Sequence, residues 1–213
     1  RNAEIVDSLR EASSFGITDL SYGFDFKSVV ERKNAVVEQL RGGVETLLRH
    51  KLITLLRGKA VFKDQHTVTV DSTDYTADYI IIATGSVSSF LPVDGADAPG
   101  ILTSREILDI DTLPERLCVI GGGVIGLEFA SVFRSFGSEV TVLEFCPGIL
   151  PRFDVDLAKR LKQSLSRRGI NIEVQAQVTR IDGNTVTYIK KEKEFTVQAD
   201  KVLMAVGRRP NTE

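Results

Sequence analysis

Hydrophobic positions follow a helical spacing in the first quarter of the chain. Apolar residues recur every three or four positions between residues 29 and 48, and Asp25 stands ahead of them as a suitable N-cap. The pattern predicts a long helix that starts after Asp25. Gly42 and Gly43 interrupt this pattern, and we expect a kink or a soft spot there because glycine disfavours the helix.

Shorter apolar runs between turn residues replace this spacing from residue 59 onward. Residues 59–62, 66–70 and 75–83 are rich in β-branched and aromatic side chains, which predicts strands. Residues 79–83 are apolar throughout, as in a strand that is buried on both faces. A stretch with scattered proline and glycine follows, and we place a domain boundary near residue 92.

The second half of the chain alternates predicted strands and helices. Strands are expected at residues 117–120, 140–144 and 171–174, with a helix at 124–136 and another that begins at Asp154. A capping box at residues 103–106 predicts one further short helix. Hairpins and a last apolar strand at 202–206 complete the pattern. The alternation predicts an α/β fold with a parallel sheet.

Composition and charge exclude several classes of function. The 213 residues include 27 basic and 29 acidic side chains, and this balance argues against nucleic acid or an anionic membrane as a partner. No apolar run approaches the ~20 residues that a membrane span needs. Two cysteines 28 positions apart make neither a disulfide framework nor a metal site, and they favour a reducing compartment.

The strongest chemical signal is a glycine-rich turn between a predicted strand and a predicted helix. Residues 121–126 read Gly-Gly-Gly-Val-Ile-Gly, and Glu144 ends the next strand 18 positions after Gly126. This arrangement is typical of a dinucleotide site, where bare backbone approaches the pyrophosphate at a helix N-terminus. The alternative is a turn that is glycine-rich only for packing.

The acid at the end of the second strand favours NAD over NADP. The Glu144 carboxylate can accept hydrogen bonds from both hydroxyls of the adenosine ribose, and it would repel a 2′-phosphate. Spacing alone makes Glu128, early in the same helix, a solvent-facing residue. Thr84-Gly85-Ser86 and Gly207 follow predicted strands, where either a plain turn or a ligand contact is expected.

Four motifs together resemble one known family. They are residues 80–86 (IIIATGS), 121–128 (GGGVIGLE), 147–154 (PGILPRFD) and 206–211 (VGRRPN), and they cover most of the chain. In this set and order the chain resembles the pyridine nucleotide-disulfide oxidoreductases, or flavin disulfide reductases. Leu127-Glu128 and Glu144 make it most similar to the NAD-using dihydrolipoyl dehydrogenase branch.

The resemblance implies a role for each motif residue. It implies a Rossmann-like three-layer NAD-binding domain with a small β-meander, joined to an incomplete FAD-domain segment. Contacts to FAD are implied for Gly58, Thr84, Gly85 and Ser86. It also places Glu128 near the nicotinamide, against the expectation from spacing. Contacts to NAD are implied for Gly121, Gly122, Gly123, Val124, Ile125, Gly126, Leu127, Glu128, Glu144, Val178 and Gly207.

The resemblance also implies that this chain is the central part of a longer enzyme. It begins at Arg1 rather than methionine, and the family's redox CxxxxC pair, first FAD fingerprint and catalytic histidine do not occur in it. The expected parts are a partial FAD-binding domain at 1–92, an NAD-binding domain at 93–206 and a return strand at 207–213. We expect no catalytic residue and no metal ligand here.

The implied function is that of the complete enzyme. It would oxidise dihydrolipoamide on lipoyl-bearing proteins of 2-oxoacid dehydrogenase complexes, through a redox disulfide and FAD, and reduce NAD. A homodimer in the cytoplasm is expected, with a mitochondrial matrix location left open. Two alternatives remain: another NAD-linked disulfide reductase or transhydrogenase, and a structural fragment without ligand that self-associates.

Overall fold

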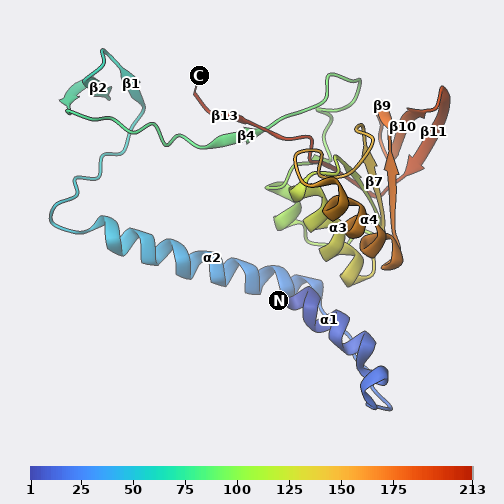
Figure 1. Cartoon of the computed structure of the whole chain (residues 1–213). Coiled ribbons are helices and arrows are strands. Elements are labelled where there is room, and N and C mark those ends of the chain that lie inside the picture. Colours follow the sequence, from blue (N-terminus) through green and yellow to red (C-terminus); the bar gives the residue numbers. More distant parts are fainter. Residues whose placement is uncertain (213) are drawn as a thin grey trace. The chain divides into compact units, whose positions relative to one another are not determined.

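The computed structural model describes residues 1–212 as two compact units (Figure 1). The first unit comprises Arg1–Val30 and Ser86–Asn211, and the second comprises Glu31–Gly85 with Thr212. The expected domain limits of 92, 93 and 206 come from composition and from the family resemblance and describe functional parts of the chain, so they stay a prediction. Among the described residues, no helix has the length and hydropathy needed to cross a membrane.

A five-stranded parallel sheet forms the centre of the first unit. Its order is β5-β12-β6-β7-β8, and every neighbouring pair is parallel. The predicted α/β fold is therefore confirmed. The strands are β5 (Ile101–Leu102), β6 (Arg116–Ile120), β7 (Glu139–Glu144), β8 (Ile170–Val174) and β12 (Lys201–Met204).

Two helices cover one face of this sheet, as Figure 1 shows. They are α3 (Val124–Phe136) and α4 (Val155–Arg167), which begins after the predicted N-cap Asp154. Alternate strand residues such as Val119 and Val142 pack with Leu127 and Phe133 of α3. The left-handed Gly137 ends α3, as its sequence predicts.

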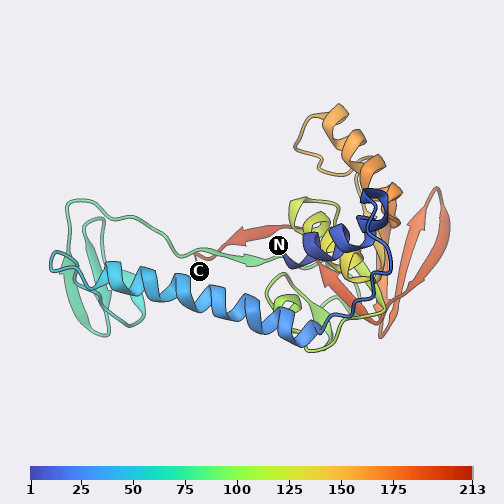
Figure 2. The ribbon, with the colours of Figure 1, turned by 90° about the horizontal axis from the view of Figure 1, so that it is seen from below.

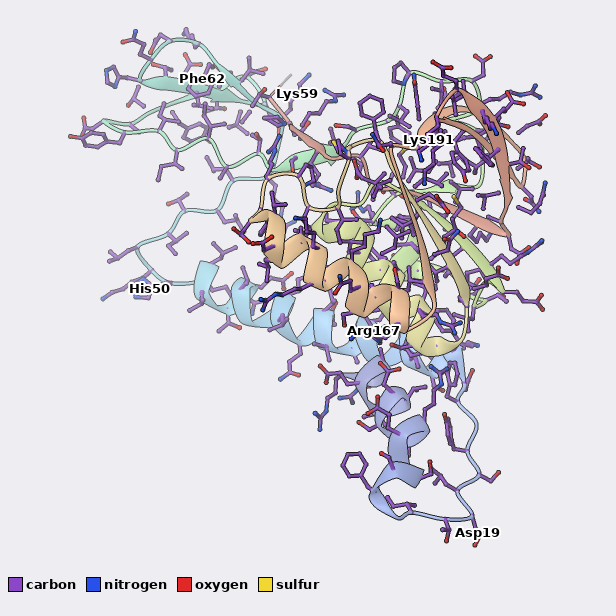
Figure 3. The ribbon with its side chains drawn as sticks, turned by 45° about the vertical axis from the view of Figure 1, so that its right-hand side comes forward. Asp19, His50, Lys59, Phe62, Arg167 and Lys191 are labelled. Carbon is purple, nitrogen blue, oxygen red and sulfur yellow. The ribbon has the colours of Figure 1, made fainter. Side chains whose placement is uncertain are left out.

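An antiparallel meander covers the opposite face (Figure 2). It consists of β9 (Gln177–Asp182), β10 (Thr185–Lys190) and β11 (Lys193–Gln198), and Lys191 lies in the turn that joins the last two (Figure 3). The remaining strand residues, such as Cys118 and Met204, pack against Val186 and Tyr188 of the meander. The expected three layers are thus present.

The N-terminal segment packs on the outer side of α3. Helix α1 (Asn2–Glu11) and the 3-10 turn η1 (Ala12–Phe15) end at the left-handed Gly16. The Asp7 carboxylate accepts hydrogen bonds from Ser135 of α3 at 2.7 Å and from Arg168, just past α4, at 2.6 Å. This polar network ties three segments distant in sequence to one another.

Two short elements differ from what the sequence predicts: the helix after the capping box and the end of the last parallel strand. The capping box at Thr103 and Glu106 forms, with the Thr103 amide donating to the Glu106 carboxylate at 2.8 Å, but it opens a 3-10 turn, η2 (Glu106–Asp109). The strand expected to reach residue 206 ends at Met204. Beyond it, β13 (Arg208–Pro210) pairs antiparallel with β4 (Ser86–Ser88).

The interruption expected at Gly42 and Gly43 does not occur. Helix α2 (Phe26–Leu48) begins in the first unit. The Asp25 carboxylate caps its N-terminus, because it accepts hydrogen bonds from the amides of Lys27 and Ser28. The helix then runs without a break through Gly42 and Gly43. Two glycines cost only ~2 kcal/mol of helix propensity, which the remaining residues of a 23-residue helix can offset.

The expected buried strand at residues 79–83 was also wrong. The second unit has a three-stranded antiparallel sheet of β1 (Ala60–Phe62), β2 (Thr67–Val70) and β3 (Thr73–Thr76). Figure 3 labels Phe62 on this sheet. Residues 79–83 are irregular, and Tyr79 and Ile81 are 91% and 88% exposed. A buried strand needs paired neighbours on its edges, and no strand within residues 1–212 pairs with this segment.

An ion pair between neighbouring strands predicts a pH dependence of stability. The Arg116 side chain donates to Asp200 at 2.6 Å and its amide donates at 2.9 Å, which lowers the pKa of the Asp200 carboxyl. A carboxyl with a lowered folded-state pKa stabilises the fold above its unfolded pKa, near 3.9, and this contribution is lost as pH falls through the folded value. In thermal melts from pH 2 to 7, Asp200→Asn should flatten the acid limb of the Tm profile, while an unchanged limb would contradict the assignment.

Candidate functional site

Two glycines of the turn after β6 are required by the protein's own packing. Gly121 has a φ of +112°, and a Cβ there would lie 2.4 Å from the carbonyl oxygen of Ala205. A Cβ at Gly126 would lie 2.1 Å from the carbonyl oxygen of Gly121. These contacts bring the start of α3 close to the sheet, as expected from the motif.

A third glycine has no such structural reason. Gly123 has a φ of −80°, which any residue can adopt, and a Cβ there would meet nothing within 4 Å. It is also the N-cap of α3, whose first turn has no side-chain cap. Uncapped helix N–H groups with open space in front of them are suited to bind an anion.

The open space is part of a cavity of about 910 Å³ in the first unit. It lies at the carboxyl ends of β6, β7 and β12, where parallel α/β sheets bind ligands. Five parts of the chain besides the glycine-rich turn form its walls. They are Ser89 with residues 91–93, the end of β7 with residues 145–146, the loop 150–153, residues 176–178, and residues 205–208.

The Glu144 carboxylate is buried between two loops of the site. One oxygen accepts the Gly122 N–H at 2.5 Å and the other accepts the Cys146 N–H at 2.7 Å. A carboxylate has further lone pairs on both oxygens, so it can still accept hydrogen bonds from a ligand. Glu144 therefore joins the glycine-rich turn to the end of β7, a role that its sequence position did not reveal.

The structure brings together most of the residues expected at NAD. Gly121, Gly123 and Glu144 line the cavity, and so do the four other residues Val124, Ile125, Val178 and Gly207. Three more are buried behind the wall: Gly122, Gly126 and Leu127. Glu128 is exposed on α3 and is not among the lining residues, so its place near the nicotinamide stays a prediction.

The residues expected at FAD divide between the two units. Gly58, Thr84 and Gly85 are exposed in the second unit, and Ser86 begins β4 of the first. Gly58 has a φ of +156°, and a Cβ there would lie 2.4 Å from the Asp71 carboxylate, so a larger residue would have to displace neighbouring side chains. The Ser86 hydroxyl accepts a hydrogen bond from Arg208 at 2.8 Å. A flavin contact at these four residues stays a prediction.

Several residues of the cavity wall were missed as site residues, among them Phe145, Arg152 and Arg208. Phe145 directly follows Glu144, Arg152 comes from the loop after β7, and Arg208 comes from β13. Arg152 and Arg208 lie within motifs that carry the family resemblance. The sequence shows that Phe145 directly follows the acid, which could have marked it as a site residue. Only the fold shows that its side chain is exposed in the cavity wall.

The two cysteines differ in environment. Burial raises the pKa of the Cys118 thiol to about 12, which agrees with an inert thiol in the core. Cys146 lines the cavity, and partial burial, together with the neighbouring Glu144 carboxylate, raises its pKa as well. Within residues 1–212, no three His, Cys, Asp or Glu side chains are grouped to hold a metal ion.

Comparison with known proteins identifies the family. The profile of the pyridine nucleotide-disulphide oxidoreductases matches residues 4–213. The chain belongs to this family. The resemblance seen in the four motifs is thereby confirmed.

Individual relatives give a finer picture of this flavoprotein oxidoreductase family. A dihydrolipoyl dehydrogenase of Acholeplasma laidlawii is 38% identical over 218 residues, which is all of this chain and 65% of that protein. One of Mycoplasma genitalium is 35% identical and is matched over 48% of its length. The solved HOCl-induced flavoprotein disulfide reductase RclA of Escherichia coli superposes with a TM-score of 0.78 at 32% identity, over 98% of this chain and 47% of that one. The chain thus spans between about half and two thirds of these relatives.

The glycine contacts predict a difference between two alanine variants. Gly126→Ala forces a Cβ against the Gly121 carbonyl oxygen and should lower stability by about 1–3 kcal/mol or more. Gly123→Ala meets nothing and should cost no more than about 1 kcal/mol, through its N-cap position. Urea unfolding measures both, and equal losses would contradict the idea that only Gly126 is needed by the fold.

Proposed function

We propose that this chain carries the NAD(H)-binding portion of a dihydrolipoyl dehydrogenase. The observation that carries the proposal is Gly123, a glycine that neither backbone angle nor packing requires, at the uncapped start of α3 in the cavity wall. An Ala at this position would meet no atom of the fold and would cost it no more than about 1 kcal/mol, but it would project into the space that a pyrophosphate needs.

The residues of the cavity fit a nicotinamide dinucleotide. The N–H groups of the glycine-rich turn and of the first turn of α3 would hold the pyrophosphate, with the helix dipole favouring its charge. Glu144 would accept hydrogen bonds from the adenosine ribose. A bound nicotinamide coenzyme would supply hydride-transfer chemistry, and the residues of this chain would bind and orient it.

Glu144 supports NAD rather than NADP as the coenzyme. Its carboxylate is fixed by the Gly122 and Cys146 amides and cannot swing away from a ligand without breaking both hydrogen bonds. A 2′-phosphate would therefore face a fixed negative charge at short range. This arrangement favours free ribose hydroxyls.

The remaining features of the proposal concern the complete enzyme. FAD would contact Gly58, Thr84, Gly85 and Ser86, and lipoyl-bearing proteins of 2-oxoacid dehydrogenase complexes would be the partners of a cytoplasmic homodimer. The curated relatives named dihydrolipoyl dehydrogenase support this version. The likeness to the HOCl-induced flavoprotein disulfide reductase of Escherichia coli supports a second candidate, a different NAD-linked disulfide reductase.

The coenzyme preference is testable on the 213-residue chain. We expect saturable NADH binding, tighter than NADPH binding, in fluorescence titration. Glu144→Gln removes the negative charge of the side chain that accepts hydrogen bonds from the ribose hydroxyls. Because a hydrogen bond to a charged group contributes about 1.5–3 kcal/mol, this variant should bind NADH roughly 10- to 150-fold more weakly.

The matched control is Glu139→Gln at the other, exposed end of β7. It should leave both affinities unchanged, and thermal melts of both variants separate lost binding from lost folding. Equal binding of NADH and NADPH by the unaltered chain would contradict the argument from the ribose. No binding of either, with no shift in Tm, would instead favour the structural fragment.

The chain alone should not turn over dihydrolipoamide. Its two cysteines cannot form a vicinal redox pair, because Cys118 is buried in β6 and Cys146 lies in the loop after β7. Incubation with dihydrolipoamide, FAD and NAD should give no absorbance rise at the NADH band. Sustained NADH production by the purified chain would overturn this expectation.

A further inference from the structure

Phe145 is unusually exposed for an aromatic residue beside a buried strand. The two residues before it, Leu143 and Glu144, are 1% and 7% exposed, whereas Phe145 is 70% exposed. It belongs to the wall of the cavity. Leaving a phenyl ring in water forgoes about 1.5–3 kcal/mol of burial, so a ligand that covers the ring would recover that free energy.

The path of a bound dinucleotide follows from two fixed points. The phosphates belong at Gly123 and the start of α3, on one side of Glu144, and the adenosine ribose belongs at the Glu144 carboxylate itself. The adenine is attached to that same ribose. It must therefore extend away from the phosphates, towards the residues that follow Glu144 in the chain.

The wall on that side offers a flat ring and a second, largely apolar surface. Phe145 and Cys146 come from the loop after β7, and Gln177 and Val178 come from the start of β9. The Ala176 amide donates to the Glu144 carbonyl oxygen at 2.9 Å, which fixes the start of β9 beside the end of β7. Aromatic faces bind bases by stacking, whereas Val178 and Gln177 can contact a base edge.

We propose that Phe145 is the platform on which the adenine ring of the coenzyme stacks. This inference rests on the proposed function, because it assumes that a dinucleotide occupies the cavity. It adds a binding residue that the four motifs do not contain. It also implies that the adenosine half supplies affinity through an apolar contact that salt does not screen.

The first experiment compares ligands that contain or lack adenine. Phe145→Ala should weaken the binding of ADP-ribose between about fivefold and 150-fold in calorimetry, the range that base stacking on an aromatic ring contributes. Phe145→Tyr keeps a flat ring and should bind within about threefold of the unaltered chain. Nicotinamide mononucleotide has no adenine, so its affinity should not respond to either variant.

The matched control is Phe15→Ala. Phe15 is as exposed as Phe145, at 79%, but it lies in η1 and is not part of the cavity wall. This variant should bind ADP-ribose like the unaltered chain. Thermal melts of all variants verify that they are folded under the conditions of the titration.

A second experiment observes the stacking directly. The sequence contains no tryptophan, so Phe145→Trp introduces a single indole at the proposed platform. ADP-ribose should quench its fluorescence through contact with adenine, whereas the indole of Phe15→Trp should show no change. ADP-ribose has no nicotinamide ring, so energy transfer to a reduced coenzyme cannot cause the signal.

The outcomes separate this inference from the proposed function. If the unaltered chain binds ADP-ribose and Phe145→Ala binds it equally well, the adenine platform is refuted while the coenzyme site stands. If ADP-ribose binds saturably to Phe145→Trp without a change in the tryptophan emission, the adenine platform is likewise refuted while the coenzyme site stands. If the unaltered chain binds neither NADH nor ADP-ribose, the proposed function fails and the platform fails with it.

Discussion

The site depends on one buried carboxylate that holds two loops together. Glu144 accepts main-chain hydrogen bonds from Gly122 in the turn after β6 and from Cys146 after β7. A buried charge without such partners would cost several kcal/mol, and each partner is the N–H of a residue in the loop that follows its strand. The same two bonds therefore satisfy the acid, close the glycine-rich turn against the sheet and fix a negative charge in the cavity wall.

Packing around this carboxylate explains why the fold and the proposed chemistry use the same residues for different reasons. Gly121 and Gly126 are glycine because main-chain atoms of Ala205 and Gly121 occupy the space of a side chain. Gly123 faces open space, so neither packing nor its backbone angles require glycine there. A sequence motif treats the three alike, whereas the contacts separate two structural glycines from one that fits a bound coenzyme.

The sheet positions this site between two different layers. Alternate residues of β6 and β7 pack against α3 and α4 on one face and against the meander on the other. The meander does more than cover the sheet, because the start of β9 supplies Val178 to the cavity wall. The acid, the glycine-rich turn and the second wall of the cavity are thus held by three rigid elements, which is the arrangement that the proposed binding of a flexible dinucleotide needs.

The sequence by itself determined the features that depend on neighbouring residues. Periodicity and caps located α3 and α4, the glycine-rich turn and the acid at the end of β7, because each signal lies within one element. One failure was non-local: residues 79–83 read as a buried strand, but burial requires partners elsewhere in the chain. The other was local, because Gly42 and Gly43 did not outweigh the helix propensity of the other residues of α2. Only the tertiary structure decided that Glu144 holds two loops, that Arg208 binds Ser86 and that Phe145 faces the cavity, because each depends on contacts between segments that the sequence separates.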